Sequence, residues 1–371
     1  CFGGCNFCAI QLHQGRRVTS RSADSIVAEA ERMTHEPDFK GYIHDIGGPT
    51  ANFRFPSCRE QMLRGMCNGG KHCLAPTTCS HMIVDHSDYL KILRRVRELP
   101  GVKKVFIRSG IRFDYLMADP DDTFFKELVE YHVSGQLKVA PEHCAPNTLA
   151  YMGKPPIQTF NKFKDKFYEL SKKAGKKQYL VPYLMSSHPG STLSDAVYLA
   201  EYLYKNHMRP EQVQDFYPTP GTVSTCMFYT GLDPYTLKPV FVEKTAEGKA
   251  LQRALLQYYE PLNAEKVIKA LKMTHREDLI PLLVPAEGRR AVQRSARRAE
   301  AAEVTIHNDG TYTVHPSQKG RSTGKNARAT APAGRQPSPG ARFAPNSAPG
   351  HKPKNNQQKE NATWKTGKKK K

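Results

Sequence analysis

Residues 1–10 of the chain read CFGGCNFCAI, so three cysteines fall within eight residues. Cys1, Cys5 and Cys8 have the spacing C-x3-C-x2-C, with two glycines in the first interval and Phe7 just before the third cysteine. Three thiolates this close can ligate one soft metal centre, and the glycines let the backbone wrap closely around it. A structural zinc site needs a fourth ligand, which is not adjacent, and ferredoxin motifs use four cysteines in other spacings.

Three cysteines on a [4Fe–4S] cluster would leave one iron without a protein ligand. That iron can bind the amino and carboxylate groups of S-adenosylmethionine (SAM) and pass one electron to its sulfonium. Homolytic cleavage then yields methionine and a 5′-deoxyadenosyl radical, which is chemistry that no side chain supplies. Taken alone, the motif leaves zinc, disulfide and cluster ligation as alternatives.

The positive charge of the chain is concentrated toward its C-terminus. Residues 286–371 carry 19 of the 56 Lys and Arg but only 5 of the 35 Asp and Glu. They are rich in Ala, Gly, Pro, Ser and Asn, and we expect a partly helical extension over 286–315 and a disordered basic tail over 316–371. A high pI that arises from a tail does not by itself indicate a nucleic-acid enzyme. The tail is either a solvated extension or a weak contact for RNA or another polyanion.

The cysteine content speaks against a disulfide-stapled scaffold. Seven of the nine cysteines lie in two groups, at residues 1–8 and 58–79, which is a metal-like distribution. The sequence contains no run of 18 apolar residues, and residue 1 does not begin a signal peptide. We therefore expect a cytoplasmic protein with no membrane contact.

From residue 20 onward, segments of helical and strand-like pattern alternate. Alternation of this kind predicts parallel strands joined by helical crossovers. With one further strand before Cys1, it predicts an α/β fold of the partial (β/α)6, TIM-like barrel type over 1–285, with a cysteine-rich insert at 52–86. A doubly wound open sheet fits the periodicity nearly as well. Strands are expected at 41–46, 102–108, 136–140, 177–185 and 211–217, and helices at 20–33, 88–99, 122–133, 157–175, 193–206, within 262–284 and at 286–304.

Polar residues follow the expected strands, at the positions where (β/α) barrels carry their sites. The first strand runs into Gly47, Gly48 and Pro49. Any one of the later residues is as readily explained by a capping or core role as by ligand contact, but the whole series points to a site. Its members are Arg108, Ser109, Arg112, Asp114, Glu142, His143, Cys144, Ser186, Ser187, His188, Tyr217 and Thr219.

The C-x3-C-x2-C loop and the strand-end strings together resemble those of the YgiQ-type family of radical SAM proteins. The strings are CFGGCNFC, DIGGPTAN, VAPEH, SSHPGST and QDFYPTPGT, and the resemblance covers about residues 1–285. It implies a [4Fe–4S] cluster on Cys1, Cys5 and Cys8, SAM as cofactor, and an electron donor such as flavodoxin or ferredoxin. Members of that family carry a long N-terminal region before the cysteine loop, which this chain lacks. The family's reaction is not established, so the resemblance implies no substrate.

The same resemblance implies where SAM is held. The backbone at Gly47 and Gly48 would take the methionine amino group, although proline replaces the acidic residue that follows the two glycines in the superfamily. Ser109 and Glu142 would contact the ribose. The SSHPG turn, which contains Ser187, would lie near the adenine.

A second group of cysteines, Cys58, Cys67, Cys73 and Cys79, lies in a segment with glycines and prolines. Four thiols there predict a second metal, either zinc or an auxiliary iron–sulfur cluster, against two disulfides or four free thiols. One of the nearby histidines could replace one of the four. Cys144 and Cys226 stand alone, and we expect both to be ordinary buried residues.

Three functions compete. The leading hypothesis is a radical SAM enzyme with an unknown substrate. A narrower version is RNA modification of the methylthiotransferase kind, but no strand-rich RNA-binding segment is expected after residue 285. The third is a non-catalytic zinc or iron–sulfur protein that associates with RNA through its tail.

Overall fold

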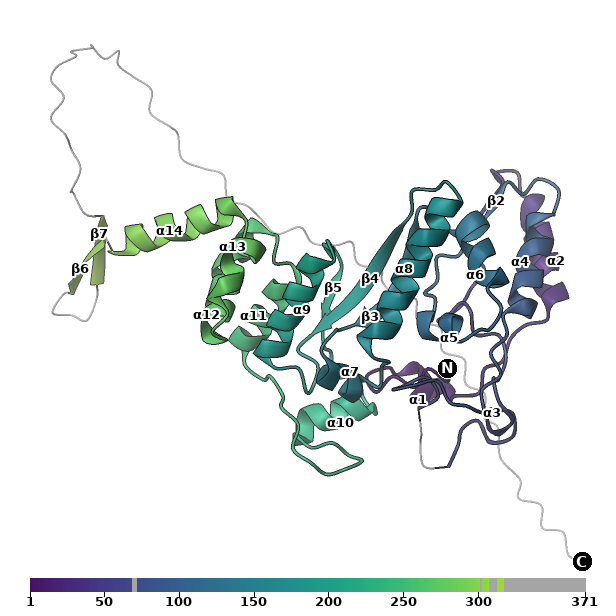
Figure 1. Cartoon of the computed structure of the whole chain (residues 1–371), viewed down its shortest axis with the longest axis horizontal. Helices are drawn as coiled ribbons and strands as arrows, with labels where there is room; N and C mark the ends of the chain where they lie inside the picture. The colour runs from purple at the N-terminus through teal and green to yellow at the C-terminus, as the bar shows by residue number, and fades with distance from the viewer. Residues whose placement is uncertain (69–71, 301, 307–311, 317–371) are drawn as a thin grey trace, which may run out of the picture. The chain divides into compact units, whose positions relative to one another are not determined.

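A computed structural model describes residues 1–68, 72–300, 302–306 and 312–316 (Figure 1). Each of the five expected strands is present in the region 1–285, and each pairs in parallel with its neighbour. Two of the strands form one sheet and three form another, and closure into a partial barrel stays a prediction. The strands are β1 Tyr42–Ile43 and β2 Lys104–Val105 in the first sheet, and β3 Gln136–Glu142, β4 Tyr179–Ser186 and β5 Val213–Asp215, in that order, in the second.

The helices that the periodicity predicts between the strands are present, and α1, α3, α5, α7, α10 and α11 are further helices that were not predicted. The expected helix at 122–133 is divided into α6 and a π-helical turn over Leu128–His132. The helices are α1 Ile10–Gln14, α2 Ala23–Thr34, α3 Arg59–Arg64, α4 Ser87–Arg97, α5 Phe113–Met117, α6 Thr123–Glu127, α7 Pro146–Met152, α8 Ile157–Lys173, α9 Leu193–Lys205, α10 Val223–Thr230, α11 Ala246–Leu256, α12 Ala264–Met273, α13 Ile280–Leu283 and α14 Ala286–Glu300.

Helix α8 shows how the apolar pattern builds the core. Phe160, Phe163 and Phe167 recur three and four residues apart, and all three are buried on one face of the helix. Phe163 stacks on Phe125 of α6 with ring centroids 5.3 Å apart. Replacing so fully buried a phenylalanine with alanine costs roughly 3–5 kcal/mol of stability. These phenylalanines belong to one hydrophobic core with Leu137 and Val139 of β3.

Side-chain caps mark the starts of two helices that the pattern predicts. Ser22 accepts a hydrogen bond from the backbone N–H of Ser25 at 3.2 Å and so begins α2. Thr192 and Asp195 form a reciprocal capping box at the start of α9. Gly175, expected to stop the preceding helix, lies two residues after α8 with φ 66°.

The C-terminal extension differs in part from expectation. The helix predicted at 286–304 is present as α14 but ends at Glu300, and it is followed by an antiparallel pair, β6 Ala302–Ile306 and β7 Tyr312–Pro316, that was not predicted. Residues 317–371 of the expected disordered tail lie outside the described residues. None of the helices in the described ranges combines the length and the apolar character that a membrane span needs.

Candidate metal centre

The first eight residues form an irregular loop that leads into α1 and is held by two other helices. Asn6 donates its backbone N–H to Met152 O and its side-chain Nδ2 to Tyr151 O, both at 2.9 Å, at the end of α7. The carbonyl of Asn6 accepts from the N–H of Ser224, in the first turn of α10, at 3.0 Å. Figure 1 shows the N-terminus beside α1 and α7. The loop is therefore fixed by elements that follow β3 and β5.

The glycines of the loop are required by its surroundings. A Cβ at Gly3 would lie 2.4 Å from Arg112 Nη1 and 3.3 Å from Cys1 Sγ. Gly4 has φ 65°, and a Cβ there would lie 3.1 Å from His72 Nδ1. A side chain at either glycine would therefore crowd Arg112 or His72. The loop has the close backbone approach that the sequence predicts, and the metal centre it would surround stays a prediction.

The three thiols suit a soft metal centre in their donor chemistry. All nine cysteines are free, Cys5 is buried, and Cys1 and Cys8 are half-buried. Burial raises the pKa of the Cys8 thiol, while nearby Lys154 acts in the opposite direction. Across the described ranges, no three Cys, His, Asp or Glu side chains converge in metal-binding geometry, and a metal on the three cysteines stays a prediction. The donor set suits an iron–sulfur cluster, which takes thiolate ligands.

A buried arginine contacts the central cysteine of the loop. Arg112 Nη1 donates to Cys5 Sγ at 3.2 Å. Its Nε and Nη2 donate to the two carboxylate oxygens of Asp114, at 2.8 and 2.5 Å. Burial alone would raise the pKa of Asp114, but the charge of Arg112 outweighs it and holds that pKa below its usual range. The pair is thus a fixed ion pair with one N–H directed at sulfur.

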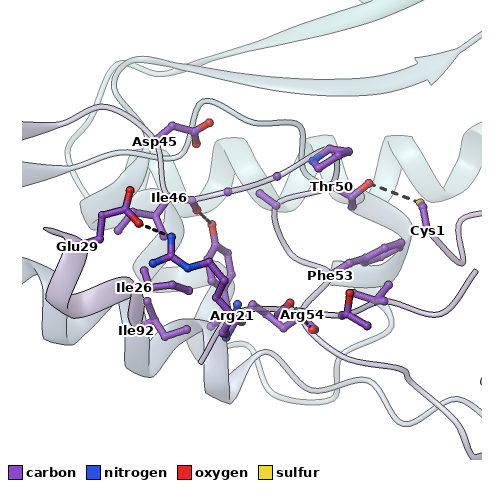
Figure 2. Close-up of a pocket in the computed structure, with 18 of the residues that line it drawn as sticks. Cys1, Arg21, Ile26, Glu29, Asp45, Ile46, Thr50, Phe53, Arg54 and Ile92 are labelled. Atoms are coloured by element: carbon purple, nitrogen blue, oxygen red, sulfur yellow. Dashed lines mark hydrogen bonds and ion pairs between the residues drawn. The ribbon is translucent and has the colours of Figure 1, made fainter. Parts of the chain in front are cut away.

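Gly47 and Gly48 lie along the same cavity as Cys1. This cavity has a volume of about 690 Å³, and its wall includes α2, β1 and residues 45–51. Figure 2 shows Cys1 beside Thr50 at one end of the cavity and Glu29 with Arg21 toward the other. Cys1 Sγ is 3.8 Å from Thr50 Oγ1. The structure therefore brings the two predicted glycines and one predicted metal ligand to one space.

Ser109 belongs to this group. Its hydroxyl donates to Asp45, and its backbone N–H donates to Asp45 Oδ1 at 3.1 Å. A Cβ on Gly47 would lie 2.7 Å from Ser109 Oγ, so the two residues are packed together. The ends of β1 and β2 are joined in this way beside the cavity.

Glu142 and Ser187 form a second group, at the carboxyl ends of β3 and β4. Both have positive φ although neither is glycine. Burial raises the pKa of Glu142, whose Oε1 lies 3.7 Å from Lys154 Nζ. Ser187 donates its backbone N–H to Gln252 Oε1 at 3.0 Å, and its buried hydroxyl has no hydrogen-bond partner among the described residues. Neither residue lines the cavity beside Gly47.

His188 links the end of β4 to the cysteine loop. Its Nδ1 donates to Pro189 O at 2.7 Å, so its Nε2 accepts from Ser224 Oγ, also at 2.7 Å. Burial lowers the pKa of His188 to about 3. The neutral ring packs edge-on against Phe7, with centroids 6.0 Å apart. Phe7 is therefore placed by a residue of the SSHPG turn.

The structure adds residues that sequence reasoning left without a role or missed. Arg112 and Asp114 were noted only as strand-end polar residues. Lys154 and Gln252 were missed, because a single polar residue after a helix or within one carries no recognisable pattern. The contacts that single them out are made across the fold and are invisible in local sequence.

The second cysteine group is partly brought together. The backbone N–H of Gln61 donates to Cys58 Sγ, and its side-chain Nε2 donates to Cys73 Sγ, both at 3.5 Å. Cys79 Sγ lies 3.8 Å from His81 Nδ1. A second metal on these residues stays a prediction.

The two isolated cysteines differ. Cys144 is buried in the core, as expected. The expectation for Cys226 was wrong, because this residue is exposed on α10. The buried residues of α10 are Ser224 and Met227, so the apolar pattern of this short helix did not reveal its inner face.

The comparisons with known proteins give homologues over part of the chain but no activity. Residues 211–363 match a family model described as a domain of unknown function, DUF3362. UPF0313 proteins of Clostridium perfringens and Clostridium botulinum are 63% and 56% identical to this chain over 280 residues. The alignments cover 76% of the chain but 42% and 44% of those relatives, so the chain spans less than half of their length. UPF0313 is the family to which YgiQ belongs. Over three quarters of its length, the chain is therefore homologous to the UPF0313 proteins.

Proposed function

We propose that the chain is the cofactor-binding core of a radical SAM enzyme with an as yet unidentified substrate. The observation that carries the proposal is the loop of Cys1, Cys5 and Cys8, whose glycines Gly3 and Gly4 pack closely against Arg112 and His72. Cys1 also lines a cavity together with Gly47 and Gly48. Three thiol donors, one of which lines a cavity, suit a cluster that keeps one iron open for a small-molecule ligand.

In this proposal Cys1, Cys5 and Cys8 hold a [4Fe–4S] cluster. When bound, the cluster supplies the electron that cleaves SAM reductively to methionine and a 5′-deoxyadenosyl radical. A flavodoxin or ferredoxin is the proposed electron donor. The chain's own part is to fix the loop through Asn6 and to enclose it with Arg112 and His72.

The residues proposed to hold SAM fall into two places. Gly47 and Gly48 would bind its methionine part with backbone groups, and Ser109 lies against Gly47. Glu142 and Ser187 would bind its ribose and adenine. Their left-handed backbone supports this role, because strained residues collect at ligand sites where the surrounding structure maintains them.

The proposed setting is the cytoplasm, where thiols are kept reduced. The nine free cysteines support it. Weak contact with RNA or another polyanion is proposed for the basic tail, on its charge alone.

Anaerobic reconstitution of the 371-residue chain tests the proposal. After reduction with dithionite and addition of SAM, we expect 5′-deoxyadenosine and at least about four iron and four sulfide per chain. Cys5→Ala should abolish 5′-deoxyadenosine formation, whereas Cys226→Ala, an exposed cysteine on α10, serves as the control. No 5′-deoxyadenosine from the wild-type chain, or equal amounts from Cys5→Ala, would contradict it. Bound zinc without labile sulfide would favour the non-catalytic alternative.

A further inference from the structure

The guanidinium of Arg112 is buried, and each of its three nitrogens donates to a different acceptor atom. Two of them, Nε and Nη2, form a fork on the carboxylate of Asp114. The third, Nη1, donates to Cys5 Sγ at 3.2 Å. The fork fixes the plane of the guanidinium, so the direction of the N–H toward sulfur is fixed as well.

The backbone of Arg112 is fixed too. The side chain of Asn52, which is 2% exposed, accepts from the N–H of Arg112 at 2.9 Å and donates to its carbonyl at 3.2 Å. Asn52 also contacts His86 Nε2 at 3.1 Å, and His86 Nδ1 lies 2.5 Å from Asp119 Oδ2. Because both the main chain and the side chain are held, Arg112 cannot leave Cys5 without breaking a buried network.

In the ion pair of Arg112 and Asp114, one nitrogen of the guanidinium makes no hydrogen bond to the carboxylate. Asp114 accepts from two nitrogens of Arg112 and from the backbone N–H of Tyr115 at 3.0 Å. Two other buried cations lie nearby: Lys154 donates to Ala140 O at 2.6 Å and lies beside Glu142, and Arg16 Nε donates to Gln11 Oε1 at 3.0 Å. Arg112 therefore directs at a thiol the nitrogen that its carboxylate partner does not engage.

We infer that Arg112 is the positioning residue of Cys5 and that it stabilises added negative charge on a cluster held there. The inference rests on the proposed function. Reduction adds one electron, taken from a low-potential donor, and neither forms nor breaks a bond. A hydrogen bond to a ligand sulfur and a nearby positive charge both favour the more negative, reduced state, so they raise the reduction potential.

The test uses variants that leave no unpaired charge. Arg112→Gln alone would strand Asp114, so the variant is Arg112→Gln with Asp114→Asn, which removes both charges and keeps amide groups in place. Arg112→Lys keeps a charge without the fork. Arg94→Gln is the control, because it removes an arginine that binds Glu127 instead of a cysteine.

The readouts are iron and sulfide per chain and the midpoint potential from a redox titration followed by electron paramagnetic resonance. In the double variant we expect at least about tenfold less reduced cluster at a fixed potential, since a hydrogen bond to a charged group contributes about 1.5–3 kcal/mol. Arg112→Lys should shift less in the same direction, and Arg94→Gln should match the wild type. An unchanged potential in the double variant overturns the inference.

Each remaining outcome also decides the matter. Suppose that the double variant folds but binds less iron per chain than the wild type. Wild-type iron content in Arg112→Lys then supports a positioning role for Arg112, and loss of iron in Arg112→Lys overturns it. If the double variant does not fold, an unshifted potential in Arg112→Lys overturns the inference. A wild-type chain that binds no cluster contradicts the proposed function itself, whereas equal potentials with a cluster present contradict only the role of Arg112.

Discussion

Glu142 and Ser187 stand at the carboxyl ends of the neighbouring strands β3 and β4, and both have left-handed backbone, with φ 67° and 59°. Neither has the freedom of glycine, and Ser187 also keeps a buried hydroxyl without a partner among the described residues. Local preferences do not produce such a pair, so the surrounding fold must maintain it. The first prediction follows from this strain.

Ser187→Gly should stabilise the chain by about 1 kcal/mol. Left-handed backbone costs a non-glycine residue roughly 1–2 kcal/mol, against about 0.5–1 kcal/mol of extra conformational entropy for glycine. Removal of the unpartnered hydroxyl adds to the gain. Urea unfolding measures the change. Ser186→Gly is the control and should destabilise, because it loses the hydrogen bond to Asp215 Oδ1 at 2.5 Å. A loss of stability in Ser187→Gly would show that the strain is not relieved there.

Gly3→Ala should weaken metal binding by the cysteine loop. The new Cβ would lie 2.4 Å from Arg112 Nη1, so either the loop or the guanidinium must move. Overpacking of this kind costs about 1–3 kcal/mol. Iron content after anaerobic reconstitution is the measurement. Gly110→Ala is the control, since a Cβ at Gly110 meets no atom of the described residues within 4 Å. Equal iron in the two variants would mean that the Gly3 contact is not required.

Acidification should destabilise the chain through His132. Burial lowers the pKa of His132 to about 4, and its Nδ1 donates to Val105 O at 2.9 Å. Between about pH 6.5 and 4 the unfolded chain therefore binds the additional proton, and the free energy of unfolding falls by up to about 1.4 kcal/mol per pH unit. His132→Asn should make this dependence shallower, as measured by urea unfolding at pH 7, 6 and 5. The exposed His35→Asn should retain the wild-type slope, and identical slopes in all three proteins would refute the assignment.

The second cysteine group should bind metal independently of the first. A chain with Cys1, Cys5 and Cys8 replaced by alanine should still bind metal. Adding Cys58→Ser and Cys73→Ser to that chain should remove the metal, because Gln61 donates hydrogen bonds to both of these thiols. Elemental analysis measures the metal, and labile sulfide distinguishes zinc from an auxiliary cluster. Cys226→Ser is the control. Two disulfides in that segment, shown by thiol titration, would contradict the prediction.

Much of the fold could be predicted because its signals are local. Apolar periodicity placed α8 and β4, and cap residues placed the start of α2. The hairpin of β6 and β7 was missed although Val304, Ile306, Tyr312 and Val314 alternate with polar residues, because the predicted helix at 286–304 extends into the first strand. Helix α10 was not predicted and Cys226 was wrongly expected to be buried, because eight residues give too little periodicity.

The sequence by itself determined the elements and the chemistry available to them. Three cysteines in one short loop define a donor set wherever the loop is placed, and residue order determines helices and strands through contacts between near neighbours. Only the tertiary structure decided that Arg112 reaches Cys5 across 107 positions, that Cys1 shares a cavity with Gly47 and Gly48, and that Glu142 and Ser187 lie apart from that cavity. Those relationships depend on how strands pair and helices pack over long sequence separations, which no local pattern records.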